Sequence, residues 1–385
     1  MPVRFDIAIV GGGIAGASLA YRLANSSARS VRRILLLERE SQPGYHATGR
    51  SAALYTQAYG NAAIRALTVA SRAFYDAPPA GFADHPLLTP RGAMVIATRA
   101  QADKLEAETL DVQRQAPQVQ LIGAAEARAL APMLRQDYAA LAAYEPDAMD
   151  MDVNAILQGC LRGAKAAGVD IRTDAPVTDL ARLNDGWRLE TPTGAVTAGI
   201  VVNAAGAWAS EVAALAGAQK IEITPKRRTA FLFKGPAGLN LSDRPMVIDV
   251  DEQFYFKPDA GLILGSPADE TPMPPHDASP DELDIAVGAD RIQRAADLPI
   301  RRIESSWAGL RSFTSDKTPV VGFDCAAPGF FWFAGQGGYG IQTAPAMAAV
   351  ATALLEGTPI AHTLPKLALS ATALAPDRFS APPRQ

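Results

Sequence analysis

Two glycine-rich turns near opposite ends of the chain are the residues best suited to chemistry. The first is Gly11-Gly12-Gly13-Ile14-Ala15-Gly16, and the second is Gly335-Gln336-Gly337-Gly338-Tyr339-Gly340. Glycine has no side chain, so its backbone can approach a ligand closely. The first turn is suited to a dinucleotide pyrophosphate and the second to the planar ring of a flavin. If one cofactor contacts both turns, the intervening chain must fold so that the turns meet.

The first turn lies in the pattern of a dinucleotide-binding unit. Residues 5–10 predict a strand, and a helical run follows from residue 14 to about residue 23. In this pattern Gly11 makes the tight turn, Gly13 lets the backbone approach the pyrophosphate, and Gly16 lets the helix pack on the sheet. The phosphates would then lie at the helix N-terminus, where free N–H groups favour negative charge.

Three polar residues downstream extend this prediction. Glu38 ends a second predicted strand, 34–37, and lies 27 residues after Gly11. Its carboxylate is suited to accept hydrogen bonds from ribose hydroxyls, which favours FAD or NAD over NADP. Arg50 and Ser51 are candidate phosphate ligands in a stretch of small and polar residues, with a surface loop as the alternative. The second glycine turn, which a nicotinamide dinucleotide does not need, favours FAD.

Candidate substrate ligands lie in the second half of the chain. Arg311 stands in an otherwise apolar, small-residue stretch, 307–313. Such an arginine is costly to bury without an anion, and a guanidinium fits a carboxylate in bidentate geometry. Arg228, in the basic cluster 226–228, is a weaker candidate of the same kind. An internal ion pair is the alternative for both arginines.

Composition limits the class of protein. The chain has 385 residues, of which 48% are hydrophobic and 20% charged, with a net charge of −4. This profile is typical of a globular protein and gives no electrostatic footprint for nucleic acid. No apolar run approaches the ~20 residues of a membrane-spanning helix. We therefore expect a cytoplasmic protein that neither spans a membrane nor binds nucleic acid.

The cysteine and acidic residues do not have the spacing of a metal-binding motif. Cys160 and Cys325 match no metal or redox spacing, and Cys160 is expected to be a buried free thiol in a helix. The acidic segment 144–152 lacks the glycine and the terminal glutamate of a calcium loop. We expect it to be a solvated crossover that ends at a helix N-cap, Asp152.

The predicted elements indicate an α/β fold with two interleaved domains. Strand and helix signals assign residues 1–82, 145–220 and 317–385 to a Rossmann-like FAD-binding domain. Residues 83–144 and 221–316 form the predicted substrate-binding domain, built on a mostly antiparallel sheet. Further helices are predicted at 60–75, 100–110, 124–134, 153–167, 281–296 and 341–355.

Four motifs together resemble the D-amino-acid oxidase superfamily of FAD enzymes, and the resemblance runs over nearly the whole chain. They are the first glycine turn with Glu38, and the stretches 49–51, 203–206 and 335–340. The stretches 42–46, 226–228, 307–313 and 336–343 are most similar to the bacterial D-arginine dehydrogenases of that superfamily. The resemblance implies non-covalent FAD and hydride transfer from the Cα of a D-amino acid to flavin N5. The products would be the imino acid and then a 2-oxo acid and ammonia.

The resemblance also implies roles for individual residues. Arg311, Arg228 and Tyr255 would hold the substrate carboxylate, the carbonyl of Gly338 would accept from the amine, and Tyr59 would lie on a lid loop. The expected cofactor contacts are Gly11, Gly13, Ile14, Ala15, Gly16, Glu38, Arg39, Thr48, Gly49, Arg50, Ser51, Ala52, Val177, Ala205, Gly206, Trp208, Gly335, Gly337, Gly338, Tyr339, Gly340 and Ile341.

Two departures from the family pattern bear on the substrate. Ala93 stands where the arginine-specific enzymes have a glutamate, and Leu54 where they have a histidine. The missing carboxylate predicts a neutral or apolar substrate rather than arginine. A secondary amine, such as an N-methyl or cyclic imino acid, is one alternative substrate, and an FAD electron-transfer protein without a small substrate is an alternative of another class. The residues leave the electron acceptor, quinone or oxygen, undecided.

Overall fold

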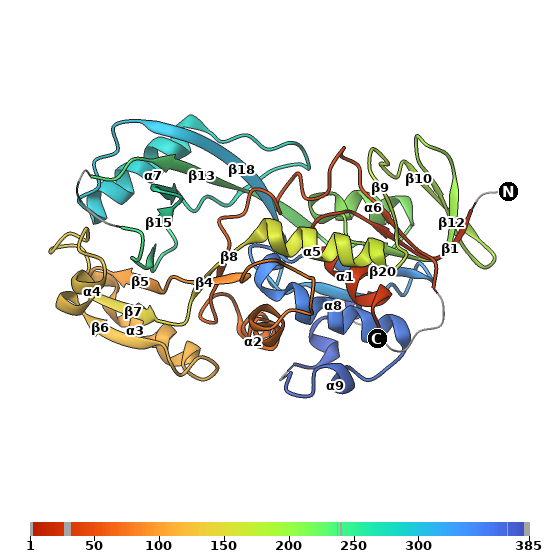
Figure 1. The fold of residues 1–385 in the computed structure, drawn as a ribbon, viewed down its shortest axis with the longest axis horizontal. Coiled ribbons are helices and arrows are strands. Elements are labelled where there is room, and N and C mark those ends of the chain that lie inside the picture. Colours follow the sequence, from red (N-terminus) through yellow and green to blue (C-terminus); the bar gives the residue numbers. More distant parts are fainter. Residues whose placement is uncertain (1–2, 27–31, 237, 239–240, 368, 381–385) are drawn as a thin grey trace, which may run out of the picture.

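Two large sheets lie at opposite ends of the molecule (Figure 1). The computed structural model describes residues 3–26, 32–236, 238, 241–367 and 369–380. The first sheet has, within this part of the chain, eight strands. They are β1 (Arg4–Val10), β2 (Ile34–Leu37), β9 (Asp170–Arg172), β10 (Asp179–Leu183), β11 (Gly186–Glu190), β12 (Val196–Asn203), β19 (Val320–Phe323) and β20 (Phe330–Ala334).

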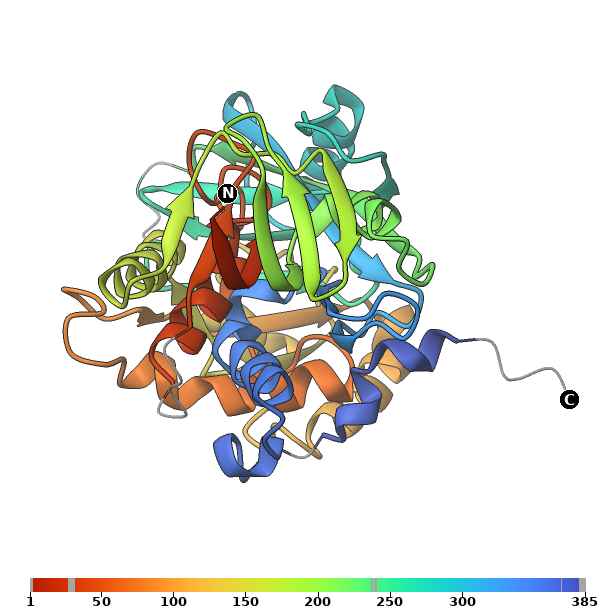
Figure 2. The same cartoon turned by 90° about the vertical axis from the view of Figure 1, so that its right-hand side faces the viewer.

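The first sheet is parallel at its centre. Its main order is β10-β11-β12-β1-β2-β9, with β20 beside β12 and β19 beside β20. The pairs of β1 with β2 and β12, of β2 with β9 and of β12 with β20 are parallel. Figure 2 views the molecule from this end, with β1 in red among the green strands.

Helices cover both faces of this sheet, as a central parallel sheet requires. Ile7 and Ile9 of β1 point into a core with α1 (Ile14–Ala24), α5 (Val153–Ala166) and α8 (Gly340–Glu356). The alternate residues, Ala8 and Val10, point into a second core that contains α6 (Ala209–Leu215). Further elements are α2 (Ala62–Asp76), which packs on α8, α9 (Ile360–Thr363), and the 3-10 turns η2 (Gly206–Trp208), η3 (Ala371–Ala373) and η4 (Pro376–Phe379).

The second sheet has nine strands within the described residues, in the order β17-β13-β16-β15-β14-β5-β7-β6, with β18 beside β13. They are β5 (Ala93–Ala97), β6 (Gln120–Gly123), β7 (Leu141–Glu145), β13 (Ile223–Phe233), β14 (Met246–Asp249), β15 (Tyr255–Asp259), β16 (Leu262–Ser266), β17 (Thr271–Pro272) and β18 (Ile303–Thr314). Only β14 and β5 pair in parallel among its described strands. Its other elements are η1 (Arg99–Gln101), α3 (Ala102–Val112), α4 (Ala124–Leu130) and α7 (Glu282–Ala295).

A small sheet connects the two halves. Its strands are β3 (Leu54–Tyr55), β8 (Met149–Met151) and β4 (Leu88–Pro90), with β8 in the middle. The predicted α/β class with two sheet-based halves is thus confirmed. The domain boundaries given above remain a prediction. No helix in the described part of the chain is long and apolar enough to cross a membrane.

The structure corrects two local predictions. The helix predicted at 124–134 ends at Leu130, because Ala131 precedes a proline and leaves the helical region. The acidic segment 144–152 is only partly solvated, since Pro146 and Asp147 are exposed but other acidic residues are not. Glu145 is only 2% exposed, and Asp150 binds the amine of Lys257 at 2.7 Å.

Two other predictions in this region hold. The side chain of Asp152 caps α5 by accepting from the N–H of Ala155 at 2.7 Å. Cys160 is a buried free thiol, and burial raises its pKa to about 12. Among the described residues, no group of three or more His, Cys, Asp or Glu side chains could hold a metal ion.

Candidate functional site

The carboxyl ends of four strands bring the predicted motifs together. In the register of the first sheet, Val10 pairs with both Leu37 and Asn203, and Asn203 pairs with Trp332. The chain leaves these strands at Gly11, Glu38, Ala204 and Gly335, so all four connections lie at one edge. Ligands of open α/β sheets bind at this edge. Both glycine turns reach one cavity there, which is lined by Gly11 and Gly13 on one side and by Gly337, Gly338 and Gly340 on the other.

The first turn has the backbone geometry of a nucleotide cradle. Gly11 has φ +112°, and a Cβ there would lie 2.4 Å from the carbonyl oxygen of Ala204. A Cβ on Gly16 would lie 1.9 Å from the oxygen of Gly11, so Gly16 serves helix packing and does not line the cavity. Ile14 begins α1, and its N–H donates to the hydroxyl of Thr48 at 3.0 Å.

Glu38 is fixed at the end of β2. One carboxylate oxygen accepts from the N–H of Gly12 at 2.8 Å and the other from the N–H of Glu40 at 2.9 Å. Each oxygen keeps further lone pairs for a ribose hydroxyl. The guanidinium of Arg39 lies 4.4 Å from the ring centre of Trp208, and both residues line the cavity.

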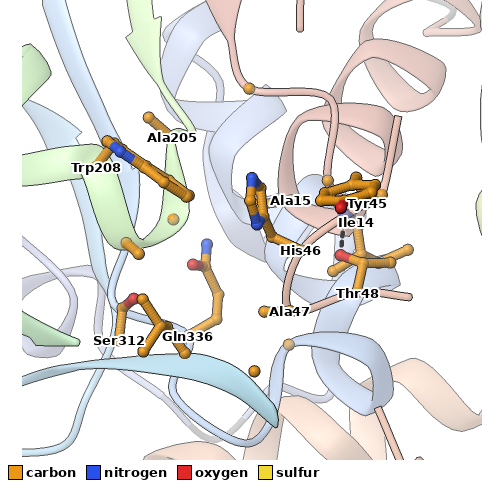
Figure 3. Close-up of a pocket in the computed structure, with 18 of the residues that line it drawn as sticks. Ile14, Ala15, Tyr45, His46, Ala47, Thr48, Ala205, Trp208, Ser312 and Gln336 are labelled. Carbon is orange, nitrogen blue, oxygen red and sulfur yellow. Dashed lines mark hydrogen bonds between the residues drawn. The ribbon is translucent and has the colours of Figure 1, made fainter. Parts of the chain in front are cut away.

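Two orphaned polar atoms lie in the same cavity wall. Nδ1 of His46 and Oγ of Ser312 are buried, and neither has a hydrogen-bond partner among the residues that the structure describes. Figure 3 shows the His46 and Trp208 rings facing each other, with Gln336 pointing between them. A buried polar atom without a partner is costly. These atoms and the glycine cradle fit a polar ligand such as FAD.

The second turn is shaped by the strand behind it. The N–H of Gly337 donates to the oxygen of Ser312 at 2.9 Å, and a Cβ on Gly337 would lie 2.3 Å from Phe313. A Cβ on Gly338 would lie 2.8 Å from Nη1 of Arg311. The N-terminus of α8 follows at Gly340, so its positive end points toward the cavity edge.

The predicted substrate ligands Arg311, Arg228 and Tyr255 all line this cavity. Arg228 donates to the oxygen of Asp269 at 2.9 Å and forms an ion pair with Glu270 at 3.3 Å. Its guanidinium also lies 6.0 Å from the ring centre of Tyr255.

Arg311 has a different environment. It donates to the hydroxyl of Tyr59 at 3.4 Å and forms no ion pair with any residue that the structure describes. Burial lowers the pKa of Arg311, but Tyr59, Tyr255 and Glu252 raise it above its ordinary value. Burial raises the pKa of Tyr59, so its hydroxyl stays neutral. Arg311 is therefore a buried cation that has no ion-pair partner among the described residues.

Most of the predicted cofactor contacts line the cavity. These are Gly11, Gly13, Ile14, Ala15, Glu38, Arg39, Thr48, Arg50, Ser51, Ala52, Val177, Ala205, Gly206, Trp208, Gly337, Gly338, Gly340 and Ile341. Outside the lining lie Gly16, Gly49, Gly335 and Tyr339, together with the predicted lid residue Tyr59. The rings of Tyr59 and Tyr339 are in contact, 4.8 Å apart. The cofactor and substrate roles of all these residues remain predictions.

Arg50 lines the cavity and also has several partners within the protein. Its guanidinium donates to the backbone oxygens of Ala278 and Ala308, both at 2.9 Å, and to the carboxylate of Asp277. Sequence reasoning also missed lining residues, among them Ser312, Gln336 and His276. Gln336 stands between two glycines of the second turn, which was a usable signal, but nothing in the sequence marks His276.

A Rossmann-like sheet with a glycine cradle, a ribose-type carboxylate and a second glycine turn defines a flavin-dinucleotide oxidoreductase. The model of the family described as FAD dependent oxidoreductase (DAO) matches residues 6–354. The chain belongs to this family, and FAD is its cofactor.

Named relatives agree with this assignment. FAD-dependent oxidoreductase domain-containing protein 1 of Mus musculus is 26% identical over 408 residues, covering 92% of this chain and 82% of that protein. Mitochondrial dimethylglycine dehydrogenase of Rattus norvegicus is 28% identical over 271 residues, covering 68% of this chain and 31% of that protein. The crystal structure of glycine oxidase from Geobacillus kaustophilus superposes with a TM-score of 0.80 at 25% identity, covering 93% of this chain and 96% of that one.

Proposed function

We propose that this chain oxidises a D-amino acid with a neutral or apolar side chain to the imino acid, which water converts to a 2-oxo acid and ammonia. The main observation behind this proposal is Arg311, an arginine in the cofactor cavity that has no acidic ion-pair partner among the described residues. A substrate carboxylate would supply that partner. Dimethylglycine dehydrogenase and glycine oxidase, by their names, act on small amines that carry a carboxylate.

Different residues of the chain bind the carboxylate and the amine of the substrate. Arg311, Arg228 and Tyr255 bind the carboxylate, and the carbonyl of Gly338 accepts from the amine. Anchoring at two points fixes the orientation of the substrate carbon, and positioning of this kind supplies much of the rate enhancement. When bound, FAD supplies the acceptor for the hydride. Quinone and oxygen remain the two candidate acceptors for the electrons of the reduced enzyme.

The environment of Ala93 supports a substrate with a neutral side chain. Val95, Ile248 and Tyr255 lie in one row of the second sheet, since Val95 pairs with Ile248 and Ile248 with Tyr255. Ala93, two residues before Val95, therefore shares the sheet face of Tyr255. Around Tyr255 this face packs an apolar cluster that includes Met246 and partly buried Leu54.

Two carboxylates near this face, those of Asp150 and Glu145, are bound by other protein groups. Lys257, two residues after Tyr255, shares Asp150 with Arg91, at 2.7 and 2.6 Å. Glu145, opposite Ala93 in the sheet, accepts from the N–H of Gln57 at 2.7 Å and from the hydroxyl of Thr56. The carboxylates of Asp150 and Glu145 are therefore held by protein groups rather than left to pair with a cationic substrate side chain, and an unpaired buried charge is costly.

Anaerobic flavin bleaching followed by steady-state kinetics tests the proposal. The panel contains D- and L-amino acids, N-methyl and cyclic imino acids, and 2-hydroxy acids. We expect kcat/KM for at least one neutral D-amino acid to exceed that for D-arginine by about tenfold or more. A higher kcat/KM for D-arginine than for every neutral D-amino acid would contradict the proposed preference for a neutral side chain.

The same panel decides between the alternatives. A preference for N-methyl or cyclic substrates would favour secondary-amine oxidation, for which the name of dimethylglycine dehydrogenase is the supporting observation. If no compound of the panel bleaches the flavin, the result would favour an electron-transfer protein without a small substrate. The likeness to D-arginine dehydrogenases and the cytoplasmic location remain part of this proposal.

A further inference from the structure

The segment between β17 and α7, residues 273–281, crosses from the substrate-side sheet to the cofactor cavity. It contains Pro274, Pro275 and Pro280, and proline restricts the backbone. Both of its ends are attached to the substrate half. The N–H of Met273 donates to the oxygen of Pro225 at 3.0 Å, and Asp281 caps α7. We call residues 273–281 the strap.

The middle of the strap rests on the nucleotide half. Ala278 is buried in a small apolar cluster with Ala207 of η2 and with Ala308 and Leu310 of β18. Trp208, which lines the cofactor cavity, packs against the same cluster. The strap therefore joins the two halves at a point beside the predicted cofactor contacts.

Asp277 and Arg50 hold this position. Arg50 donates to the carboxylate of Asp277 and to the oxygens of Ala278 and Ala308. The hydroxyl of Tyr45 donates to the other carboxylate oxygen of Asp277 at 3.1 Å. Arg50 is mostly buried, with 15% of its side chain exposed, whereas the side chain of Asp277 is 58% exposed. The accessible partner is thus the one that can be changed with least damage to the fold.

The strap is also a wall of the cavity. His276 and Ala278 line the same cavity as both glycine turns, and so do Tyr45 and Arg50, the two residues that bind Asp277. Moving the strap away would break these bonds and open that wall.

We propose that the strap gates the passage of FAD, and that Asp277, through Arg50 and Tyr45, is the residue that keeps the gate closed. A gate slows passage in both directions, so opening it should accelerate both release and binding. This inference concerns the cofactor alone, so it stands or falls independently of the substrate proposed above.

The test uses the purified holoenzyme and compares Asp277→Ala with a matched control, Asp185→Ala. Asp185, in the turn between β10 and β11, also pairs with an arginine, Arg4 at the start of β1, but both residues lie outside the cavity lining. FAD release is followed by the fluorescence of free FAD after dilution, and rebinding by its quenching when apoprotein is added. For Asp277→Ala we expect both rates to rise by about 3- to 10-fold, the effect of a lost partly exposed ion pair with its hydrogen bond. Asp185→Ala should keep wild-type rates.

Unchanged release from Asp277→Ala would overturn the proposal. Faster release with unchanged rebinding would also overturn it, because it would show a lost contact with bound FAD rather than a gate. A second variant, Tyr45→Phe, removes only the hydroxyl and covers the case in which Asp277→Ala does not fold. It should accelerate both rates in the wild-type background and have no further effect in the Asp277→Ala background. Additive effects of the two substitutions would contradict the shared contact.

Discussion

At the scale of single residues, two arginines of the same sheet show how neighbours decide a role. Arg227 lies on β13 within ion-pair distance of Asp269, Asp281 and Asp284. Arg311 lies on the adjacent β18, opposite Lys226, and within the described residues its side-chain hydrogen-bond partner is the hydroxyl of Tyr59. The sequence shows two similar basic residues in strands. Only the placement of acidic side chains makes Arg227 structural and leaves Arg311 available for a ligand.

This difference predicts the effect of Arg311→Lys. Lysine keeps the charge but loses the planar fork that binds a carboxylate at two points. We expect kcat/KM for the best substrate to fall by about 10- to 100-fold, the value of a charge-assisted hydrogen bond, with FAD content unchanged. Steady-state kinetics and the flavin absorbance measure the two quantities.

Arg227→Lys is the matched control for that experiment. It alters an ion-paired arginine one strand away, so it should change thermal stability more than kcat/KM. If Arg311→Lys kept wild-type kcat/KM, the carboxylate would have to be bound elsewhere.

At the scale of elements, the turn between β1 and α1 depends on the neighbouring strand. Gly11 has φ +112°, and any Cβ there would collide with the backbone of Ala204, which follows β12. The close approach of these two chains is what brings the cavity edge together. Gly81 offers a comparison, because it has φ +78° but no atom within 4 Å of its would-be Cβ.

Gly11→Ala and Gly81→Ala should therefore differ. Both introduce a left-handed alanine, at a cost of about 1 kcal/mol in the free energy of unfolding. Gly11→Ala must also displace the backbone at Ala204, which adds about 1–3 kcal/mol and misshapes the cradle. Denaturant unfolding measures the stability, and FAD titration of the apoprotein should show affinity lost by about tenfold or more for Gly11→Ala alone. Equal losses for the two variants would show that the close approach to Ala204 does not matter.

At the scale of the whole molecule, the sequence predicted the local elements well and the long-range contacts poorly. The helix that begins at Ile14 and the cap at Asp152 follow from local patterns, and both are present. Glu145 looked like part of a solvated segment, because its donors lie some ninety residues earlier, at Thr56 and Gln57. The contact of Arg50 with Asp277 could not be predicted for the same reason, since the two residues are 227 positions apart. Such contacts depend on which loops the sheets bring together.

The cavity is formed by segments that lie far apart in the sequence. Its walls come from both ends of the chain, from Val10 to Ile341, and from both sheets. A ligand that binds only the folded state stabilises it by mass action, by about 2.7 kcal/mol at 100 times its dissociation constant. FAD should therefore raise the melting temperature of the apoprotein by about 3 °C at that concentration, as measured by thermal unfolding.

ADP is the informative comparison for this shift. It carries the adenosine and pyrophosphate that suit Gly11–Gly16 and Glu38, but it lacks the ring that would reach Gly335–Gly340. At the same concentration as FAD it should give a clearly smaller rise in melting temperature, because it contacts only one of the two glycine turns. An equal rise would mean that the second turn adds nothing to cofactor binding. Its four glycines would then need another explanation, and the convergence of the two turns on one cavity would not reflect one shared cofactor.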